Sequence, residues 1–236
     1  MGPSLPDLVT VSGALASHLA RVEADLACQQ AVRGLDALDE LDLHPVIAAG
    51  LEAVGCGVLR EVRYPGPVGR RARRSERERC DLVLTPGPGQ RLADPVEALR
   101  EQDRMEGTLF AQIGAGPDEG VAPQDALWLE VKTLGQFAFR DGTPGPNPSY
   151  ASELVGGPAR DIGKLARDGR IESAAVVIVL FCADEAVARH DIAAAAMRWL
   201  DKDLPFAEPL LDGLPIQDRI GNGWCAVALV RVRAPG

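Results

Sequence analysis

Apolar residues recur at intervals of three and four along the first part of the chain, which is the spacing of a helix with one buried face. Within residues 7–31 they are Leu8, Val11, Leu15, Leu19, Val22 and Leu26. A second helix, or a pair of short ones, is predicted over residues 39–54 and is expected to end at Gly55 and Gly57. Asp42 is its expected N-cap, because Pro45 then falls near the first turn, where proline is tolerated.

Beyond Gly57 the pattern changes to alternation and short apolar runs, which are typical of strands. Strands are predicted over residues 58–64, 80–85, 126–134, 174–183 and 224–233. The run at 174–183 is apolar throughout, as expected of a central strand that is buried on both faces. Residues 69–79, between the first two strands, predict a hairpin loop.

Two further helices are predicted, over residues 150–168 and 184–201. The Gly-Gly-Pro sequence at 156–158 is expected to break or bend the start of the first of these. Residues 139–149 are rich in glycine and proline, and we expect them to form a loop.

This order of elements predicts an α/β fold, with a mixed central sheet of about five strands and helices on its faces. Residues 1–41 are expected to form a helical extension packed on the core. Residues 42–236 are expected to form one domain, with a polar insertion near 86–125.

Composition agrees with a globular protein, since 46% of the 236 residues are hydrophobic and 25% are charged. The longest apolar runs are half a membrane span or less, and the five cysteines are scattered singly. We therefore expect reduced thiols, a cytoplasmic location and no membrane span. The net charge of −9 argues against a general nucleic-acid coat protein, but not against a nucleic-acid enzyme.

Three charged residues interrupt two of the apolar strands. Asp81 lies in the strand 80–85, and Glu130 and Lys132 lie in the strand 126–134. Residues two apart on a strand share a face, so Glu130 and Lys132 project together, and Asp81 joins them if the two strands are neighbours. Buried charges are costly unless they are paired or bind metal, so this pattern predicts a metal site.

Two carboxylates suit Mg²⁺, for which Mn²⁺ is the expected substitute. A water on such an ion has a lowered pKa and becomes a nucleophile. Lys132 would stabilise the negative charge that grows on a phosphorane, and the backbone carbonyl of Val131 is a further expected ligand. The predicted chemistry is metal-assisted cleavage of a phosphodiester.

The same residues resemble the motif of the PD-(D/E)xK nuclease superfamily, whose fold is called restriction-endonuclease-like. The likeness rests on Asp81, on Glu130-Val131-Lys132 and on the helix–strand–strand–strand–helix–strand order of residues 42–183. The proline that precedes the aspartate in the family is Cys80 here. The resemblance implies a Mg²⁺-dependent endonuclease or exonuclease, a hydrolase acting on ester bonds, with Asp81, Glu130 and Lys132 as catalytic residues.

The superfamily often adds an acidic ligand from its first helix, and Glu52 matches that position best. The alternative is an exposed helical glutamate, and Glu61 on the first strand is a rival ligand. Gln136 lies four residues past Lys132. It either contacts substrate or a metal-bound water, or it caps the strand end.

Several basic residues are candidates for substrate binding. Arg160 and Lys164 are one turn apart on the helix that the resemblance places beside the active site, unless they belong to a solvated face. Residues 60–79 hold eight arginines and three acids. Within them we expect a basic arm that follows a phosphate backbone, with a solvated loop as the alternative. The residues of this arm are Arg70, Arg71, Arg73, Arg74 and Arg77.

Three functions remain open from the sequence. The leading hypothesis is a metal-dependent nuclease that acts on DNA. The second is a non-catalytic, nuclease-like module that binds nucleic acid or a partner protein, and the third is an α/β protein in which Asp81 and Lys132 form only a structural salt bridge. A homodimer is compatible with each of them.

Overall fold

The computed structural model describes residues 4–66, 78–94, 120–140 and 142–233, with the side chain of Arg140 left out. Within these ranges it contains four α-helices and eight strands. The helices are α1 (Leu8–Cys28), α2 (Glu40–Glu52), α4 (Tyr150–Arg167) and α5 (Glu185–Leu200). The strands are β1 (Gly57–Arg63), β2 (Arg79–Thr85), β3 (Leu127–Gly135), β4 (Phe137–Arg140), β5 (Thr143–Pro146), β6 (Ser173–Cys182), β7 (Leu210–Pro215) and β8 (Trp224–Val232).

Six strands form one mixed sheet in the order β1-β2-β3-β6-β8-β7. β1, β2 and β3 pair antiparallel, β3 and β6 pair parallel, and β8 pairs antiparallel with both β6 and β7. The parallel pair needs a crossover connection, which α4 provides. The α/β class and the mixed sheet are thus confirmed, with one strand, β7, that the sequence did not predict.

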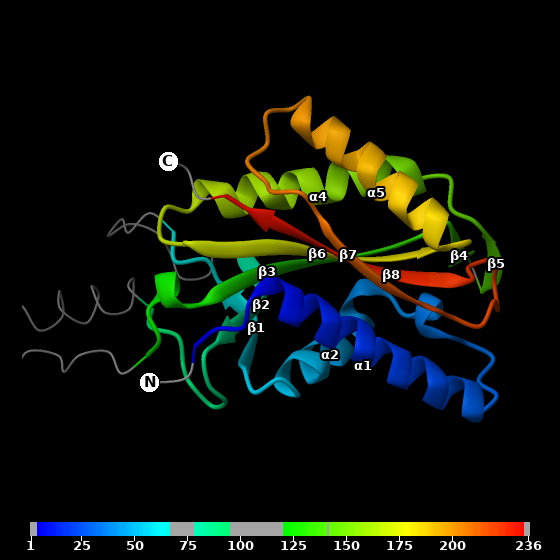
Figure 1. Ribbon diagram of the computed structural model, residues 1–236, viewed down its shortest axis with the longest axis horizontal. Coiled ribbons are helices and arrows are strands. Elements are labelled where there is room, and N and C mark those ends of the chain that lie inside the picture. Colours follow the sequence, from blue (N-terminus) through cyan, green and yellow to red (C-terminus); the bar gives the residue numbers. More distant parts are fainter. Residues whose placement is uncertain (1–3, 67–77, 95–119, 141, 234–236) are drawn as a thin grey trace, which may run out of the picture.

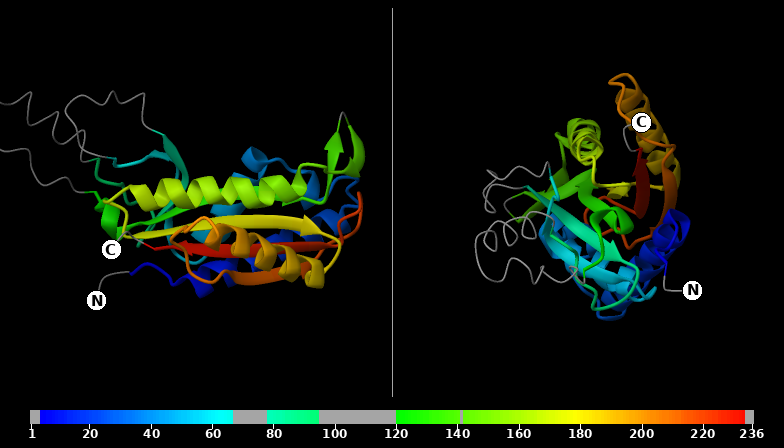
Figure 2. Two further views of the ribbon diagram at one scale, coloured as in Figure 1. Left: turned by 90° about the horizontal axis from the view of Figure 1, so that it is seen from above. Right: turned by 90° about the vertical axis from the view of Figure 1, so that its left-hand side faces the viewer.

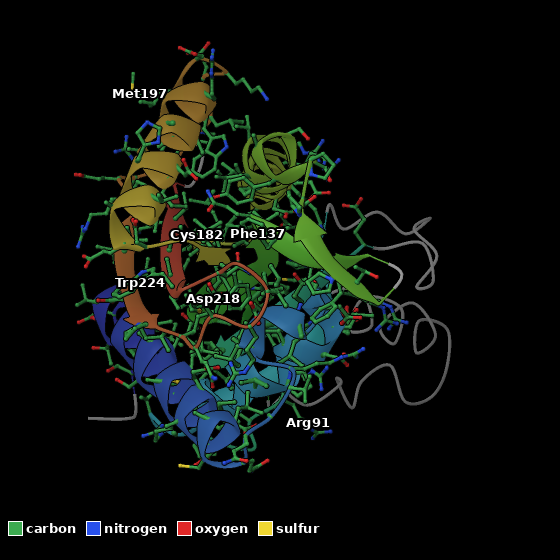
Figure 3. The ribbon with its side chains drawn as sticks, turned by 90° about the vertical axis from the view of Figure 1, so that its right-hand side faces the viewer. Arg91, Phe137, Cys182, Met197, Asp218 and Trp224 are labelled. Atoms are coloured by element: carbon green, nitrogen blue, oxygen red, sulfur yellow. The ribbon has the colours of Figure 1, made fainter. Side chains whose placement is uncertain are left out.

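Helices cover both faces of this sheet, with α4 and α5 on one side and α1 and α2 on the other (Figure 1). The alternation of side chains along β6 supplies both cores. Val176 and Ile178 belong to the core beneath α4 and α5, whereas Val177 and Val179 belong to the core on α1 and α2. Figure 3 looks along the sheet from the end marked by Phe137 and Cys182 and shows the two helical layers on either side.

Helix α1 is part of the layer that covers the C-terminal strands. Leu15 and Leu19 are each 1% exposed, in the same core as Val227 and Leu229 of β8. Two buried polar links fasten this layer to the segment before β8. Arg219 Nη1 lies 2.6 Å from Glu23 Oε1, and Asn222 Nδ2 donates to Asp36 Oδ2 at 3.0 Å. The expected boundary between residues 41 and 42 falls inside α2.

Helix α2 begins three residues earlier than its expected cap implied. Its N-cap is Asp39, whose Oδ1 accepts the backbone N–H of Asp42 at 2.8 Å. The prediction of Asp42 as the cap was therefore wrong, and Pro45 lies inside the helix rather than in its first turn. Glu40 is thus the first residue of the helix.

Residues 139–149 are not only a loop, which corrects that prediction. β4 and β5 form a separate two-stranded hairpin near Gly142, whose φ of +78° suits glycine. Both strands are edges, so the prolines at 144 and 146 cost no ladder hydrogen bond within a larger sheet. The hairpin projects from one end of the main sheet (Figure 2).

Helix α4 runs without a break through Gly156-Gly157-Pro158, so the expected interruption was wrong. Gly157 and Pro158 are buried. A Cβ at position 157 would lie 3.5 Å from Lys132 Cδ, an ordinary van der Waals distance, so α4 packs beside that lysine.

No helix of the described residues is long and apolar enough to cross a bilayer. The expected arginine arm and most of the expected insertion lie outside the described residues.

Candidate functional site

The candidate site lies where the backbone ladder between β2 and β3 ends, which we call the β2–β3 junction. Leu82, Val83 and Leu84 pair with Leu129, Trp128 and Leu127, and beyond them β3 pairs with β6 alone. At the junction Asp81 Oδ2 accepts the backbone N–H of Val131 at 2.7 Å. A side chain thus takes the position of a strand partner, which fixes the Asp81 carboxylate against β3.

Lys132 connects both helical layers at this junction. Its Nζ lies 3.2 Å from Glu40 Oε1 at the start of α2 and 3.5 Å from Asp161 Oδ2 on α4. It also donates to the carbonyl of Val131 at 2.9 Å. Burial lowers the pKa of Lys132, but the charges of Asp161, Glu40 and Asp81 outweigh it, so the pKa is raised and the ammonium stays charged.

Glu130 lies on the α4 side of the junction and is 2% exposed. The Tyr64 hydroxyl donates to its Oε1, and Lys164 Nζ lies 2.7 Å from the same atom. Burial and then the charge of Asp81 raise the pKa of Glu130 to about 7, although Lys164 and Tyr64 oppose the shift. Glu130 therefore already has a cation and a hydrogen-bond donor.

The junction holds more negative than positive groups among the described residues. Its carboxylates are Glu40, Asp81, Glu130 and Asp161, and its ammonium groups are Lys132 and Lys164. Glu61, which lies beside Asp81, adds a fifth carboxylate, so the acidic groups outnumber the two lysines when all are ionised. Burial is the largest cause of the raised pKa values of Glu130 and Asp161.

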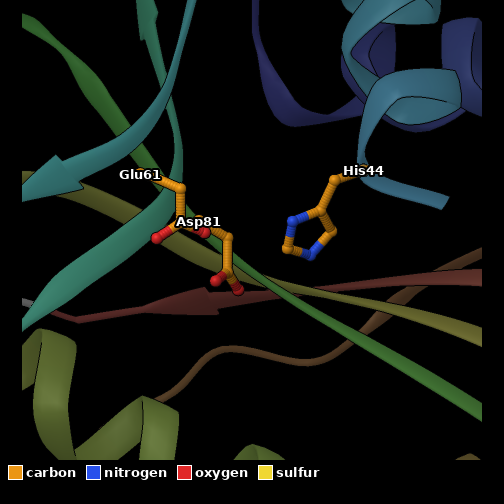
Figure 4. A group of neighbouring side chains, drawn as sticks. All are labelled: His44, Glu61 and Asp81. Atoms are coloured by element: carbon orange, nitrogen blue, oxygen red, sulfur yellow. The ribbon is translucent and has the colours of Figure 1, made fainter. Parts of the chain in front are cut away.

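A second group of ligand atoms meets at Asp81 from the α2 side. One atom each of His44, Glu61 and Asp81 lies within 4.8 Å of the others (Figure 4). Glu61 interrupts the β1 ladder, since Arg60 and Val62 pair with β2 around it and its φ is +53°. The register of β1 and β2 is the same on both sides of Glu61, so Glu61 falls opposite Asp81, and the two carboxylates lie beside each other (Figure 4).

Comparison with family models, curated proteins and solved structures finds no match. Any assignment of function therefore rests on the geometry of the site alone.

The three residues expected at the centre of the site lie on neighbouring strands. β2 and β3 pair directly, and Asp81 acts electrostatically on both Glu130 and Lys132. The ligand group at Asp81 contains His44 and Glu61 but not Glu130. Of the two acids considered as an additional ligand, the rival Glu61 belongs to this group, whereas Glu52 is exposed at the last residue of α2.

The remaining candidates have other surroundings. The carbonyl of Val131 accepts from Lys132 Nζ. Gln136 holds the ends of β3 and β6 together, because its Oε1 accepts the backbone N–H of Ala183 at 3.2 Å, which agrees with the strand-capping alternative. Arg160 is exposed, while Lys164 pairs with Glu130, so the two do not form one phosphate grip in this arrangement.

Sequence reasoning missed three residues of the junction: Glu40, His44 and Asp161. A signal existed for each of them. Glu40 and His44 are four apart on one helix, and His44 adjoins the apolar positions that α2 buries. Asp161 occupies a buried position on α4 beside Ile162. A charged or titratable residue at a buried helical position indicates a partner in the core.

The raised pKa of Glu130 predicts a pH-dependent contribution to stability. Because its pKa is about 7 in the folded chain and near 4.5 when unperturbed, this contribution is full below pH 4.5 and is lost as the pH rises through 7. The shift corresponds to roughly 3 kcal/mol. We expect Glu130→Gln, which cannot titrate, to gain about that much relative to wild type between pH 4.5 and pH 8. Urea unfolding at both pH values measures it, and parallel pH profiles would contradict the assignment.

Proposed function

We propose that this protein is a metal-dependent phosphodiesterase, a nuclease that cleaves DNA at the β2–β3 junction. The observation that carries the proposal is the position of Asp81, held by Val131 N–H among acidic groups that outnumber the nearby lysines. The order α2–β1–β2–β3–α4–β6 and its pairing also match the arrangement expected of a restriction-endonuclease-like core, which supports the proposal.

The residues present suit a divalent ion, because His44 Nε2 is buried without a hydrogen-bond partner among the described residues, and a ring nitrogen of His44 lies in the group with Asp81 and Glu61. Asp81, Glu61 and His44 are the residues that would hold it. A bound divalent ion supplies a water of lowered pKa as the attacking group. The sequence-based expectation for the ion is Mg²⁺, with Mn²⁺ as substitute.

Lys132 is proposed to stabilise the charge that develops on the phosphate. Its ammonium is held by Glu40 and Asp161 from opposite helical layers, so it is oriented before substrate binds. A preoriented donor of this kind loses little reorganisation energy during the reaction.

One observation favours a second candidate, a non-catalytic module that binds nucleic acid or a partner protein. Glu130, a metal ligand by the resemblance, has its Oε1 shared between Tyr64 and Lys164. An acid with these partners is less available to an ion, so the junction would then be a structural ion-pair network.

A cleavage assay separates the two. The full chain is incubated with supercoiled and with linear DNA, each with Mg²⁺, with Mn²⁺ or with EDTA. We expect nicking or degradation with a divalent ion and none with EDTA. Binding to DNA without cleavage under either metal would favour the second candidate, and cleavage that persists in EDTA would contradict a metal-dependent mechanism.

A further inference from the structure

The side chain of His44 is buried in an unusual way. His44 is 1% exposed on α2, and its Nε2 has no hydrogen-bond partner within the part of the chain that the structure describes. Buried polar atoms are nearly always hydrogen-bonded, so an orphaned ring nitrogen requires an explanation. A metal ion is the natural partner of an unprotonated imidazole nitrogen.

Two carboxylates face this histidine from separate strands. Figure 4 shows the imidazole of His44 turned toward the side chains of Glu61 and Asp81. One ligand atom from each residue lies within 4.8 Å of the other two, which groups them as candidate ligands of one ion. The three residues come from α2, β1 and β2, and Asp81 is fixed by its bond from Val131 N–H.

The donor set is one nitrogen and carboxylate oxygens. Mg²⁺ is a hard ion that prefers oxygen ligands throughout and keeps several waters. Imidazole ligands instead suit first-row transition ions, whose affinity for mixed nitrogen and oxygen sites rises from Mn²⁺ through Co²⁺. The position of His44 therefore bears on which ion the protein selects.

We propose that His44, Glu61 and Asp81 form a binding site for a divalent first-row transition ion in preference to Mg²⁺. The site shares Asp81 with the proposed nuclease centre, so its role in cleavage rests on the proposed function, whereas its metal selectivity does not. It replaces the all-oxygen site expected from the sequence with one in which a buried histidine discriminates between ions.

The test is a metal titration of the full chain without DNA. Calorimetry measures binding of Co²⁺, Mn²⁺ and Mg²⁺, and visible absorption follows the environment of Co²⁺. The variants are His44→Phe and Glu61→Gln. Phenylalanine keeps an aromatic ring but has no nitrogen ligand, and Glu61 is exposed, so its variant is expected to fold. Glu52→Gln is the matched control, an exposed glutamate on the same helix as His44.

We expect one Co²⁺ site per chain that binds at least about tenfold more tightly than Mg²⁺. His44→Phe and Glu61→Gln should each weaken Co²⁺ binding by about tenfold or more, with Glu52→Gln unchanged. His44→Phe should also change the visible absorption of bound Co²⁺ and reduce the ratio of Co²⁺ affinity to Mg²⁺ affinity. If His44→Phe does not fold, Glu61→Gln decides.

The proposal is overturned if Co²⁺ and Mg²⁺ bind equally well, or if Glu61→Gln binds Co²⁺ like wild type. Cleavage of DNA is measured separately, so the two proposals can fail independently. Selective Co²⁺ binding without DNA cleavage would support the proposed metal site and contradict the proposed nuclease function. DNA cleavage without a preference for Co²⁺ over Mg²⁺ would support the nuclease function and contradict the proposed metal selectivity.

Discussion

Asp81→Asn is expected to lower DNA cleavage by more than about a hundredfold while the chain stays folded. Asparagine keeps an oxygen that accepts the N–H of Val131, so the β2–β3 junction is preserved. It loses the negative charge that a divalent ion requires, so metal binding should be lost together with activity. The measurement is a single-turnover cleavage rate, with calorimetry of the same sample.

Two companion variants sharpen this result. Lys132→Met should lower the rate by about a hundredfold and leave metal binding nearly intact, because it removes a stabilising charge rather than a ligand. Asp212→Asn, at an exposed position on the far edge strand β7, should behave like wild type. If Asp81→Asn cleaves DNA as fast as Asp212→Asn, the catalytic centre does not lie at the β2–β3 junction.

Arg219→Met is expected to lower the free energy of unfolding by about 3–5 kcal/mol. Arg219 and Glu23 form an ion pair whose side chains are only 5% and 7% exposed, so removal of the arginine leaves a buried, unpaired carboxylate. Arg219 also donates through Nε to the carbonyl of Ala31 at 3.0 Å. Urea unfolding followed by circular dichroism gives the change.

The double variant Glu23→Met, Arg219→Met provides the control. Removing both charges eliminates the unpaired group, so the double variant should regain most of the lost stability. The wild-type pair already leaves Glu23 Oε2 and Arg219 Nη2 without partners among the described residues, which favours apolar replacement. A loss below about 1 kcal/mol for Arg219→Met alone would mean that water reaches the pair.

Helices and strands whose apolar residues repeat regularly could be predicted from the sequence, whereas elements without such a repeat could not. α1, α5 and β6 follow their apolar spacing to within a few residues of the expected bounds. β7 has the sequence Leu-Leu-Asp-Gly-Leu-Pro, in which glycine and proline hide a strand that forms only because β8 lies beside it. The β4–β5 hairpin was missed for the same reason.

Much of the candidate site was likewise predictable, but only the part carried by strands. Asp81, Glu130 and Lys132 are conspicuous because a charge in a short apolar strand requires a partner. Glu40 and His44 reach the junction because α2 packs on the sheet. A local sequence pattern does not show how close a helix residue comes to a strand after packing. The positive φ of Glu61 could not be predicted from sequence either, since this conformation is uncommon for glutamate.

The packing of α1 on β7 and β8 has a consequence for synthesis of the chain. About 180 residues separate the end of α1 at Cys28 from the start of β7 at Leu210. At a translation rate of about 5–20 residues per second, the ribosome needs roughly 10–40 s to make them. Throughout that interval the apolar face of α1 has only part of its final contacts, whereas α2 through β6 are complete once Cys182 emerges. The nascent protein can therefore assemble the β2–β3 junction before its first helix reaches its final position.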